Sequence, residues 1–140
     1  MSKQLLIAVD DSDVSSEAVT YALDEWPEAV VTLIHVVDPS GTVASGGGAG
    51  IPGTVDGPES AGRERGERLL SETAEQIEDP VDTRLEFGSP ASVITNLAET
   101  GRHDHIVMGS HGRTGISRIV LGSVAEGVVR RSPVPVTVVR

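Results

Sequence analysis

Several residue types and segments are scarce in this sequence, and each scarcity excludes a class of function. The chain has no cysteine, which excludes disulfides, thiolate nucleophiles and cysteine-ligated metals. Aromatic residues make up only 2% of it, and Lys3 is the only lysine among its 11 Lys and Arg residues. No apolar run approaches the roughly 20 residues that a membrane-spanning helix needs, so we do not expect a membrane protein.

Acidic residues dominate the charge of the chain. The formal net charge of -10 argues against general binding to nucleic acid, which depends on Lys and Arg neutralising phosphates. The segment Met1–Gln4 leads directly into an apolar run and lacks the layout of a signal peptide. We therefore expect a cytoplasmic protein, and the length of 140 residues predicts one domain spanning 1–140.

Segments of strand and helix character alternate along the chain. Apolar runs and alternating patterns predict five strands, at 5–9, 30–37, 81–87, 105–108 and 134–139. Helical spacing predicts helices between them, from Val14 to Pro27, from 59 to 78, from Pro90 with Ser89 as its cap, and from Val124 to Val129. This order predicts an α/β fold, a three-layer open five-stranded parallel sheet with helices on both faces. Ligands of such sheets bind beyond the carboxyl ends of the strands, where the strand order reverses.

Residues 39–58 interrupt this pattern because they are rich in Gly, Ser and Pro, with Gly46–Gly50 at their centre. Such a composition cannot build a core, so we expect a mobile connector. A lid that folds over bound phosphates is the alternative function for the glycine run.

A glycine motif lies between the fourth strand and the last helix. Its spacing is Gly109, two residues, Gly112, nine residues, then Gly122-Ser123. Glycine lets the main chain come close to a ligand, and a helix start offers unpaired amides and a positive dipole end that suit phosphate. The spacing is neither a Walker A loop nor a dinucleotide fingerprint, and on spacing alone a structural turn remains an alternative.

The chain resembles the universal stress proteins in several separate segments. The similarity is carried by Met108–Arg113, Leu121–Ala125, Ser132–Val136, Ile7–Ser12 and Leu33–Asp38. The glycine spacing matches the ATP-binding branch of that family. The resemblance implies a Rossmann-like sheet of the adenine nucleotide alpha hydrolase type, with the first strand central. It also implies a homodimer in which the last strand meets a second copy.

The resemblance implies a role for each matching residue at the base and the ribose. Ala8 and Val9 would line the wall beside the adenine, and the main chain of Val36 would hydrogen-bond the adenine edge. The carboxylate of Asp10 would hold the ribose hydroxyls. Capping of the first helix is the alternative role for Asp10, although Asp11, Ser12 and Asp13 could all serve there.

The phosphate side of the implied site comes from the glycine motif. Met108 and Gly109 would lie under the ribose and the first phosphate, and Gly112 and Arg113 would wrap the phosphate chain through their amides. The helix start would close the chain of phosphates with Gly122, Ser123 and Val124. Mg²⁺ would be carried by the phosphates of ATP, with AMP or ADP as alternative ligands, and no metal would be held by protein side chains.

Other polar residues have simpler explanations. Ser123 and Glu126 form a capping-box pattern, which would use the same hydroxyl as phosphate binding. His103, Asp104 and His105 could hold a metal, but we expect them on a solvated rim opposite the ligand. His35 is expected to point into the packing of the sheet, and His111 to be polar filling without a catalytic role.

These observations predict an adenine-nucleotide-binding sensor or regulator of the stress response. No general base and no metal-holding carboxylate pair is readable, which argues against an efficient enzyme. Two alternatives remain: a dimeric interaction module that binds no nucleotide, and a slow ATP hydrolase. The downstream protein partner is not identifiable from the sequence.

The composition also predicts a dependence of stability on salt. An acidic surface poor in lysine and aromatics is typical of proteins from salt-loving organisms, and an ordinary acidic cytoplasmic protein is the alternative. We expect the midpoint of thermal unfolding to rise between dilute buffer and molar potassium chloride, because salt screens repulsion among carboxylates. A midpoint that stays constant in calorimetry would contradict the halophilic interpretation.

Overall fold

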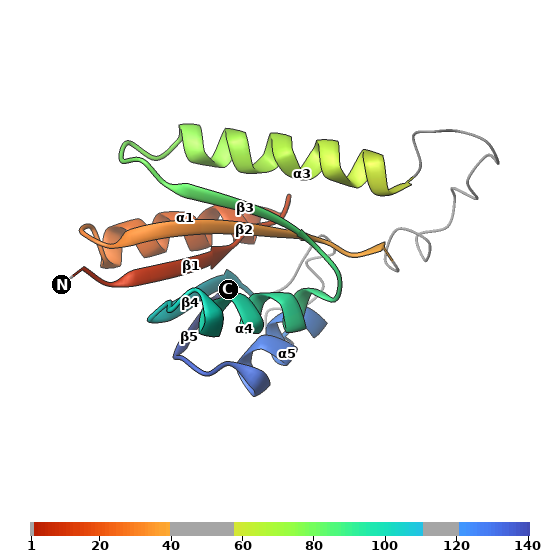
Figure 1. The fold of residues 1–140 in the computed structure, drawn as a ribbon. Helices are drawn as coiled ribbons and strands as arrows, with labels where there is room; N and C mark the ends of the chain where they lie inside the picture. Colours follow the sequence, from red (N-terminus) through yellow and green to blue (C-terminus); the bar gives the residue numbers. More distant parts are fainter. Residues whose placement is uncertain (1, 40–57, 111–120) are drawn as a thin grey trace.

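The computed structural model describes residues 2–39, 58–110 and 121–140, and its elements alternate as expected (Figure 1). The strands are β1 (Gln4–Ala8), β2 (Val30–Val37), β3 (Asp82–Phe87), β4 (His105–Gly109) and β5 (Val136–Val139). The helices are α1 (Asp13–Glu25), α3 (Pro58–Glu75), α4 (Pro90–Thr100) and α5 (Ser123–Arg131).

The five strands form one parallel sheet in the order β3-β2-β1-β4-β5, which confirms the predicted fold class. β1 is central, as the resemblance implies, and β3 lies at an edge. The chain builds outward from β1 to β3 and then returns to add β4 on the other side of β1. The strand order therefore reverses between β1 and β4, which places the expected ligand crevice at their carboxyl ends.

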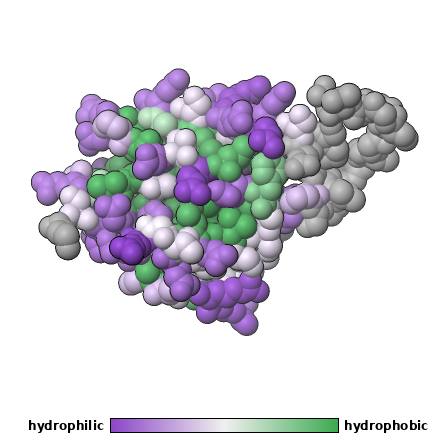
Figure 2. Space-filling model, in the orientation of Figure 1, coloured by the Kyte–Doolittle hydropathy of each residue, from purple (hydrophilic) through white to green (hydrophobic). Residues whose placement is uncertain are grey.

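Two apolar cores sandwich the sheet because successive strand residues point to opposite faces. Leu5 and Ile7 of β1 belong to the core under α1 and α3, whereas Leu6 belongs to the core under α4 and α5. All three side chains are fully buried. The outer surface of α3 is hydrophilic, as its charged sequence predicts, and apolar side chains gather below it in the middle of the same view (Figure 2).

Local hydrogen bonds set helix ends that differ from the sequence expectation. α3 ends at Glu75 and not at 78, because the N–H groups of Gln76 and Ile77 donate to carbonyls three residues back, at 3.1 Å each, and tighten the turn. At α4, Ser89 is the N-cap residue as predicted, but its side chain makes no cap hydrogen bond. Pro90 provides the first helical position instead.

The last strand begins at Val136, two residues later than its apolar run suggested. The N–H of Val134 donates to the Ser132 hydroxyl oxygen at 3.0 Å, and that hydroxyl donates to the Val134 carbonyl at 2.6 Å. Both main-chain groups of Val134 are thus held in a local turn. Pro135 has no N–H, although its carbonyl accepts from the Ile106 N–H at 3.0 Å.

Two expectations fall on residues that the structure does not describe. The connector at 40–57, with the Gly46–Gly50 run, and the segment 111–120 lie outside the described ranges. Among the helices of the described ranges, none is both long and apolar enough to cross a membrane.

Helices α4 and α5 approach closely at Gly127, so a larger residue at this position tests their packing. A Cβ added to Gly127 of α5 would lie 2.7 Å from the Ala91 Cβ of α4. We expect Gly127→Val to lower the free energy of unfolding by about 1–3 kcal/mol through overpacking, measured by urea denaturation. Adding Ala91→Gly should restore part of the loss, and a single variant as stable as the wild type would contradict this account.

Candidate functional site

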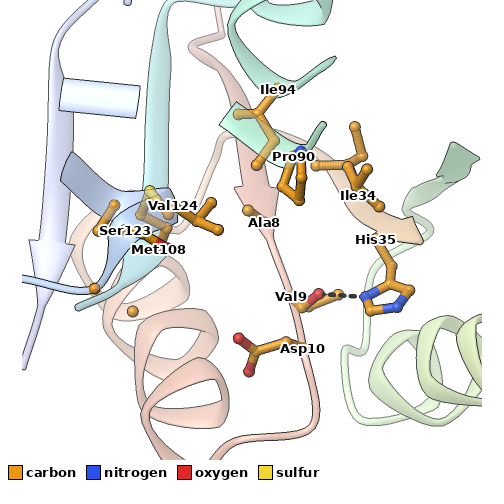
Figure 3. Close-up of a pocket in the computed structure, with 14 residues that line it drawn as sticks. Ala8, Val9, Asp10, Ile34, His35, Pro90, Ile94, Met108, Ser123 and Val124 are labelled. Atoms are coloured by element: carbon orange, nitrogen blue, oxygen red, sulfur yellow. Dashed lines mark hydrogen bonds between the residues drawn. The ribbon is translucent and has the colours of Figure 1, made fainter. Parts of the chain in front are cut away.

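A cavity of about 280 Å³ lies at the carboxyl ends of β1, β2 and β4, on the face covered by α4 and α5 (Figure 3). Such crevices are where open α/β sheets bind ligands. Every predicted site residue within the described ranges lines it: Ala8, Val9, Asp10, Val36, Met108, Gly109, Gly122, Ser123 and Val124. The other two, Gly112 and Arg113, lie outside the described residues, as does His111.

The cavity wall also contains residues that sequence reasoning did not assign to the site. These are Ile34, His35, Pro90, Ile94 and Ala125. Two of them, Ile34 and His35, directly precede Val36 in β2, and the proline begins α4 at the same edge of the sheet. The signal for Pro90 was present, since a helix that follows a parallel strand starts at the carboxyl edge. The inward direction of Ile94 depends on how α4 packs, which the sequence alone did not give.

Asp10 is held rigidly at the mouth of the cavity. Its Oδ1 accepts hydrogen bonds from the Ser12 N–H at 2.8 Å and from the Ser12 hydroxyl. Its own N–H donates to the Ser15 hydroxyl oxygen at 2.9 Å. Ser12 and not Asp10 caps α1, because the Ser12 Oγ accepts from the Ser15 N–H at 3.2 Å. Within the described ranges, the second carboxylate oxygen of Asp10 has no hydrogen-bond partner, and it is available to a ligand.

The main chain of Val36 faces the space beyond the end of β1. The β1–β2 ladder ends at the pair Ala8–Ile34, and the Ile34 carbonyl accepts the last bond from the Val9 N–H at 2.9 Å. Residues that alternate along β2 point to the same neighbouring strand, so Val36 points toward β1 where β1 has already ended. In the described part of the chain its N–H and C=O have no partner there, which leaves a donor beside an acceptor.

Gly109 is required by packing as well as by its place in the motif. A Cβ on Gly109 would lie 2.8 Å from Val14 Cγ1 and 3.3 Å from the Ser15 amide nitrogen, both in the first turn of α1. Main-chain atoms cannot move aside as the end of a side chain can. The glycine therefore lets β4 pass directly beneath the start of α1, an explanation that the sequence reasoning did not include.

The start of α5 is fixed at the cavity edge. The Gly122 N–H donates to the Ser110 carbonyl at 2.6 Å, and the Ser110 N–H donates to the Val139 carbonyl at 2.8 Å. The capping box that was the alternative role for Ser123 does not form, because Gly122 is the N-cap and Ser123 is already the first helical residue. The Ser123 hydroxyl has no hydrogen-bond partner in the described ranges. The helix start thus presents its amides and positive dipole end at the cavity.

The lining residues divide into an apolar floor and a polar rim. Ala8, Ile34, Ile94 and Met108 form the floor, and Val36 belongs to the same apolar cluster. Polar groups stand around it: the Asp10 carboxylate, the Val36 main chain and the α5 start. Asp10 and His35 are the only ionisable lining residues that the structure describes. This arrangement suits a flat apolar ring that carries polar and anionic substituents.

The three residues at the opposite rim are not gathered at one point. The Asp104 carboxylate accepts from the Gln4 N–H at 2.8 Å, and His105 Nε2 lies 2.7 Å from the Thr137 hydroxyl. His105 also packs on Trp26, with ring centroids 4.8 Å apart. Burial, with the charge of Lys3, lowers the pKa of His105. His105 is half-buried at this rim, whereas Asp104 is exposed. The described residues contain no group of three His, Asp or Glu placed to hold a metal ion.

Comparison with known proteins places this geometry in a family. The sequence model of the universal stress protein family matches residues 1–140. A universal stress protein of Methanocaldococcus jannaschii is 37% identical over 99% of this chain and 82% of its own length.

Solved structures share the fold. A universal stress protein in complex with cAMP has a TM-score of 0.68 at 22% identity, covering 99% of this chain and 97% of that one. The Archaeoglobus fulgidus protein in complex with dAMP has a TM-score of 0.66 at 20% identity, covering 99% and 98%. From the match to the family model and the M. jannaschii relative, this chain belongs to the universal stress protein family.

Proposed function

We propose that the cavity binds an adenine nucleotide, with ATP as the principal ligand and AMP or ADP as alternatives. The observation that carries this proposal is the sequence of groups around one cavity. A paired donor and acceptor at Val36, an apolar floor, the carboxylate of Asp10 and the amides at the start of α5 follow one another along its wall. In an adenine nucleotide, the base needs the donor, the acceptor and the apolar floor. The ribose needs an acceptor such as the carboxylate, and the phosphates need the amides, in this order along the molecule.

The base and ribose would occupy the β1–β2 side. Ala8 and Val9 would contact the face of the adenine, and the Val36 N–H and C=O would bond its edge. The unpartnered oxygen of Asp10 would accept from the ribose hydroxyls, while Ser12 keeps the carboxylate in place. A carboxylate bound to a hydroxyl gives a charge-assisted hydrogen bond, which is stronger than one between neutral groups.

The phosphates would lie between β4 and α5. Met108 and Gly109 would lie beneath the first phosphate, and the start of α5, from Gly122 to Val124, would contact the chain of phosphates. We extend the same proposal to Gly112 and Arg113, whose position the glycine spacing suggests. Mg²⁺ would be held mainly by the phosphate oxygens, which suits a cation that keeps several of its waters.

Relatives support an adenylate ligand. The two solved structures above contain cAMP and dAMP, which share the adenine base that Val36 would contact. We propose that the protein acts in the cytoplasm as a stress-response regulator, in which nucleotide binding changes the affinity for a downstream protein. ATP shifts such an equilibrium only if it binds the two states unequally.

The Asp10 carboxylate gives the sharpest test of this function. Asp10→Asn keeps an oxygen for Ser12 and removes the charged acceptor, so we expect the affinity for Mg-ATP to fall by about 10- to 100-fold. Isothermal titration calorimetry in high salt measures it. Asp79→Asn removes the same charge at the exposed turn before β3, at the opposite end of the sheet, and should bind as the wild type does. Equal affinities of the two variants, or a wild type that binds no adenylate, would refute the proposal.

We also propose that a second copy of the chain pairs along the open edge of β5. The Pro135 and Val139 carbonyls both accept bonds from the β4 side, so the alternate residues Val136 and Val138 direct their main-chain groups to the open edge. All four residues of the strand are only half-buried. An uncovered apolar edge strand is a template for pairing with another chain.

A proline at the edge tests this pairing without removing a bond to β4. Val138→Pro deletes an N–H that points outward, so we expect sedimentation at micromolar concentration in high salt to give a dimer for the wild type and a monomer for the variant. Thermal unfolding of the variant is the control for its fold. A monomeric wild type under the same conditions would overturn the dimer.

A further inference from the structure

The open main chain of Val36 has a local cause. If the β1–β2 ladder continued by one more step, the Val36 N–H would donate to the Val9 carbonyl, as the Val30 N–H donates to the Lys3 carbonyl at 2.8 Å. That bond does not form within the described chain. The Val9 carbonyl is the natural partner of Val36, so a group that holds this carbonyl turned away from Val36 leaves the Val36 N–H available to a ligand.

The imidazole of His35 holds the Val9 carbonyl. His35 Nδ1 lies 2.8 Å from the Val9 carbonyl oxygen, as the dashed line in Figure 3 shows. A carbonyl can only accept, so Nδ1 carries the proton and donates. His35 and Val36 are neighbours in β2, and their side chains lie on opposite faces of the sheet. The histidine thus binds the carbonyl from the α3 face, away from the cavity floor on the α4–α5 face.

Helix α3 fixes the position of the ring. A Cβ on Gly66 of α3 would lie 2.9 Å from His35 Cδ2 and 2.5 Å from Leu85 Cδ1. The imidazole therefore fills space that exists only because residue 66 has no side chain. A ring that is packed on one side and hydrogen-bonded on the other is a rigid element, suited to holding a main-chain group in one place.

We propose that His35 is a positioning residue of the adenine site, which holds the Val9 carbonyl so that the Val36 N–H stays free to bond the base. This inference rests on the proposed function. The Watson–Crick edge of adenine presents the N1 acceptor beside the 6-amino donor, and it complements the N–H and C=O of a single residue. Loss of the His35 bond lets the Val9 carbonyl take the Val36 N–H, which removes the partner of N1.

Amide hydrogen exchange in the nucleotide-free protein tests the main-chain part of the proposal. His35→Phe keeps a ring beside Gly66 but cannot donate, so the Val36 amide should become protected by the Val9 carbonyl and exchange at least about 10-fold more slowly than in the wild type. His35→Asn places an amide N–H near the position of Nδ1 and should restore the wild-type rate. Unchanged exchange in His35→Phe would overturn the proposal.

Nucleotide analogues test the recognition part. The wild type and His35→Asn should prefer ATP over 1-deaza-ATP, which lacks the N1 acceptor, by about 10-fold. His35→Phe should lose this preference and bind ATP about 10-fold more weakly. 7-Deaza-ATP, which keeps N1, is the matched ligand control. A merely structural histidine would weaken both nucleotides equally and leave the preference intact, and that result would refute the positioning role.

Two glycines of α3 provide a second pair of variants in case substitution of His35 disturbs the fold. Gly66→Ala should displace the ring and protect the Val36 amide. Gly62→Ala creates a similar clash with Val37 Cγ1, at 2.7 Å, away from His35, and should leave Val36 exchange unchanged. A wild type that binds no purine nucleotide would refute the proposed function and the recognition role of His35. The exchange data would still show whether His35 keeps the Val36 N–H free.

Discussion

The site depends on an inequality in length between two neighbouring parallel strands. β2 continues to Val37, whereas β1 stops at Ala8, opposite Ile34. Beyond that pair, β2 keeps β3 as a neighbour on one side and loses its partner on the other. In a continuous sheet the donor and acceptor of Val36 would be consumed by the ladder. Because β1 ends first, the N–H and C=O of Val36 remain open on that side. Pairing of β2 with β3 on the other side fixes their direction.

The rest of the cavity is held by bonds that cross between elements. Ser110, almost fully buried, connects two of them, because its N–H goes to the Val139 carbonyl and its own carbonyl accepts from Gly122. The end of β5 and the start of α5 are thus both tied to the residue that follows β4. Asp10 is fixed in the same way through Ser12 and Ser15. The polar groups around the cavity therefore need little rearrangement to bind a ligand, which lowers the entropic cost of binding.

Periodicity alone predicted the order of the elements and the sheet, because buried parallel strands have continuous apolar sequences and helices have a different period. Its errors lie at the ends of elements, where local hydrogen bonds override the apolar pattern. Val134 is apolar enough for a strand, yet the Ser132 hydroxyl takes both its polar groups. The capping box at Ser123 does not form because Gly122 is the N-cap, one residue earlier than that pattern requires. Both effects act over one or two residues and concern hydrogen bonds, which the spacing of apolar residues does not describe.

The residues around the cavity were also predictable only in part. Their places at strand ends follow from the sequence pattern, whereas contacts between elements do not. Strand ends such as Asp10 and Val36 follow from topology, since all parallel strands present their carboxyl ends at one edge. The hydrogen bond of His35 to Val9 joins residues 26 positions apart and depends on the strand register, so the sequence suggested only that the histidine packs against the sheet. That prediction holds, because the ring packs against α3, and the bond from Nδ1 to the Val9 carbonyl is the part that the sequence could not show.

The two described glycines of the motif illustrate why spacing alone could not separate a ligand loop from a structural turn. Gly109 is explained without any ligand, since α1 leaves no room for a Cβ. Gly122 is different: its φ of -65° and ψ of 162° are open to any residue, so backbone conformation does not require glycine there. Its N–H is already bonded to Ser110, and its Cα lines the cavity. The remaining advantage of glycine at 122 is the absence of a side chain between the helix start and whatever occupies the cavity, which is what close approach of a phosphate requires.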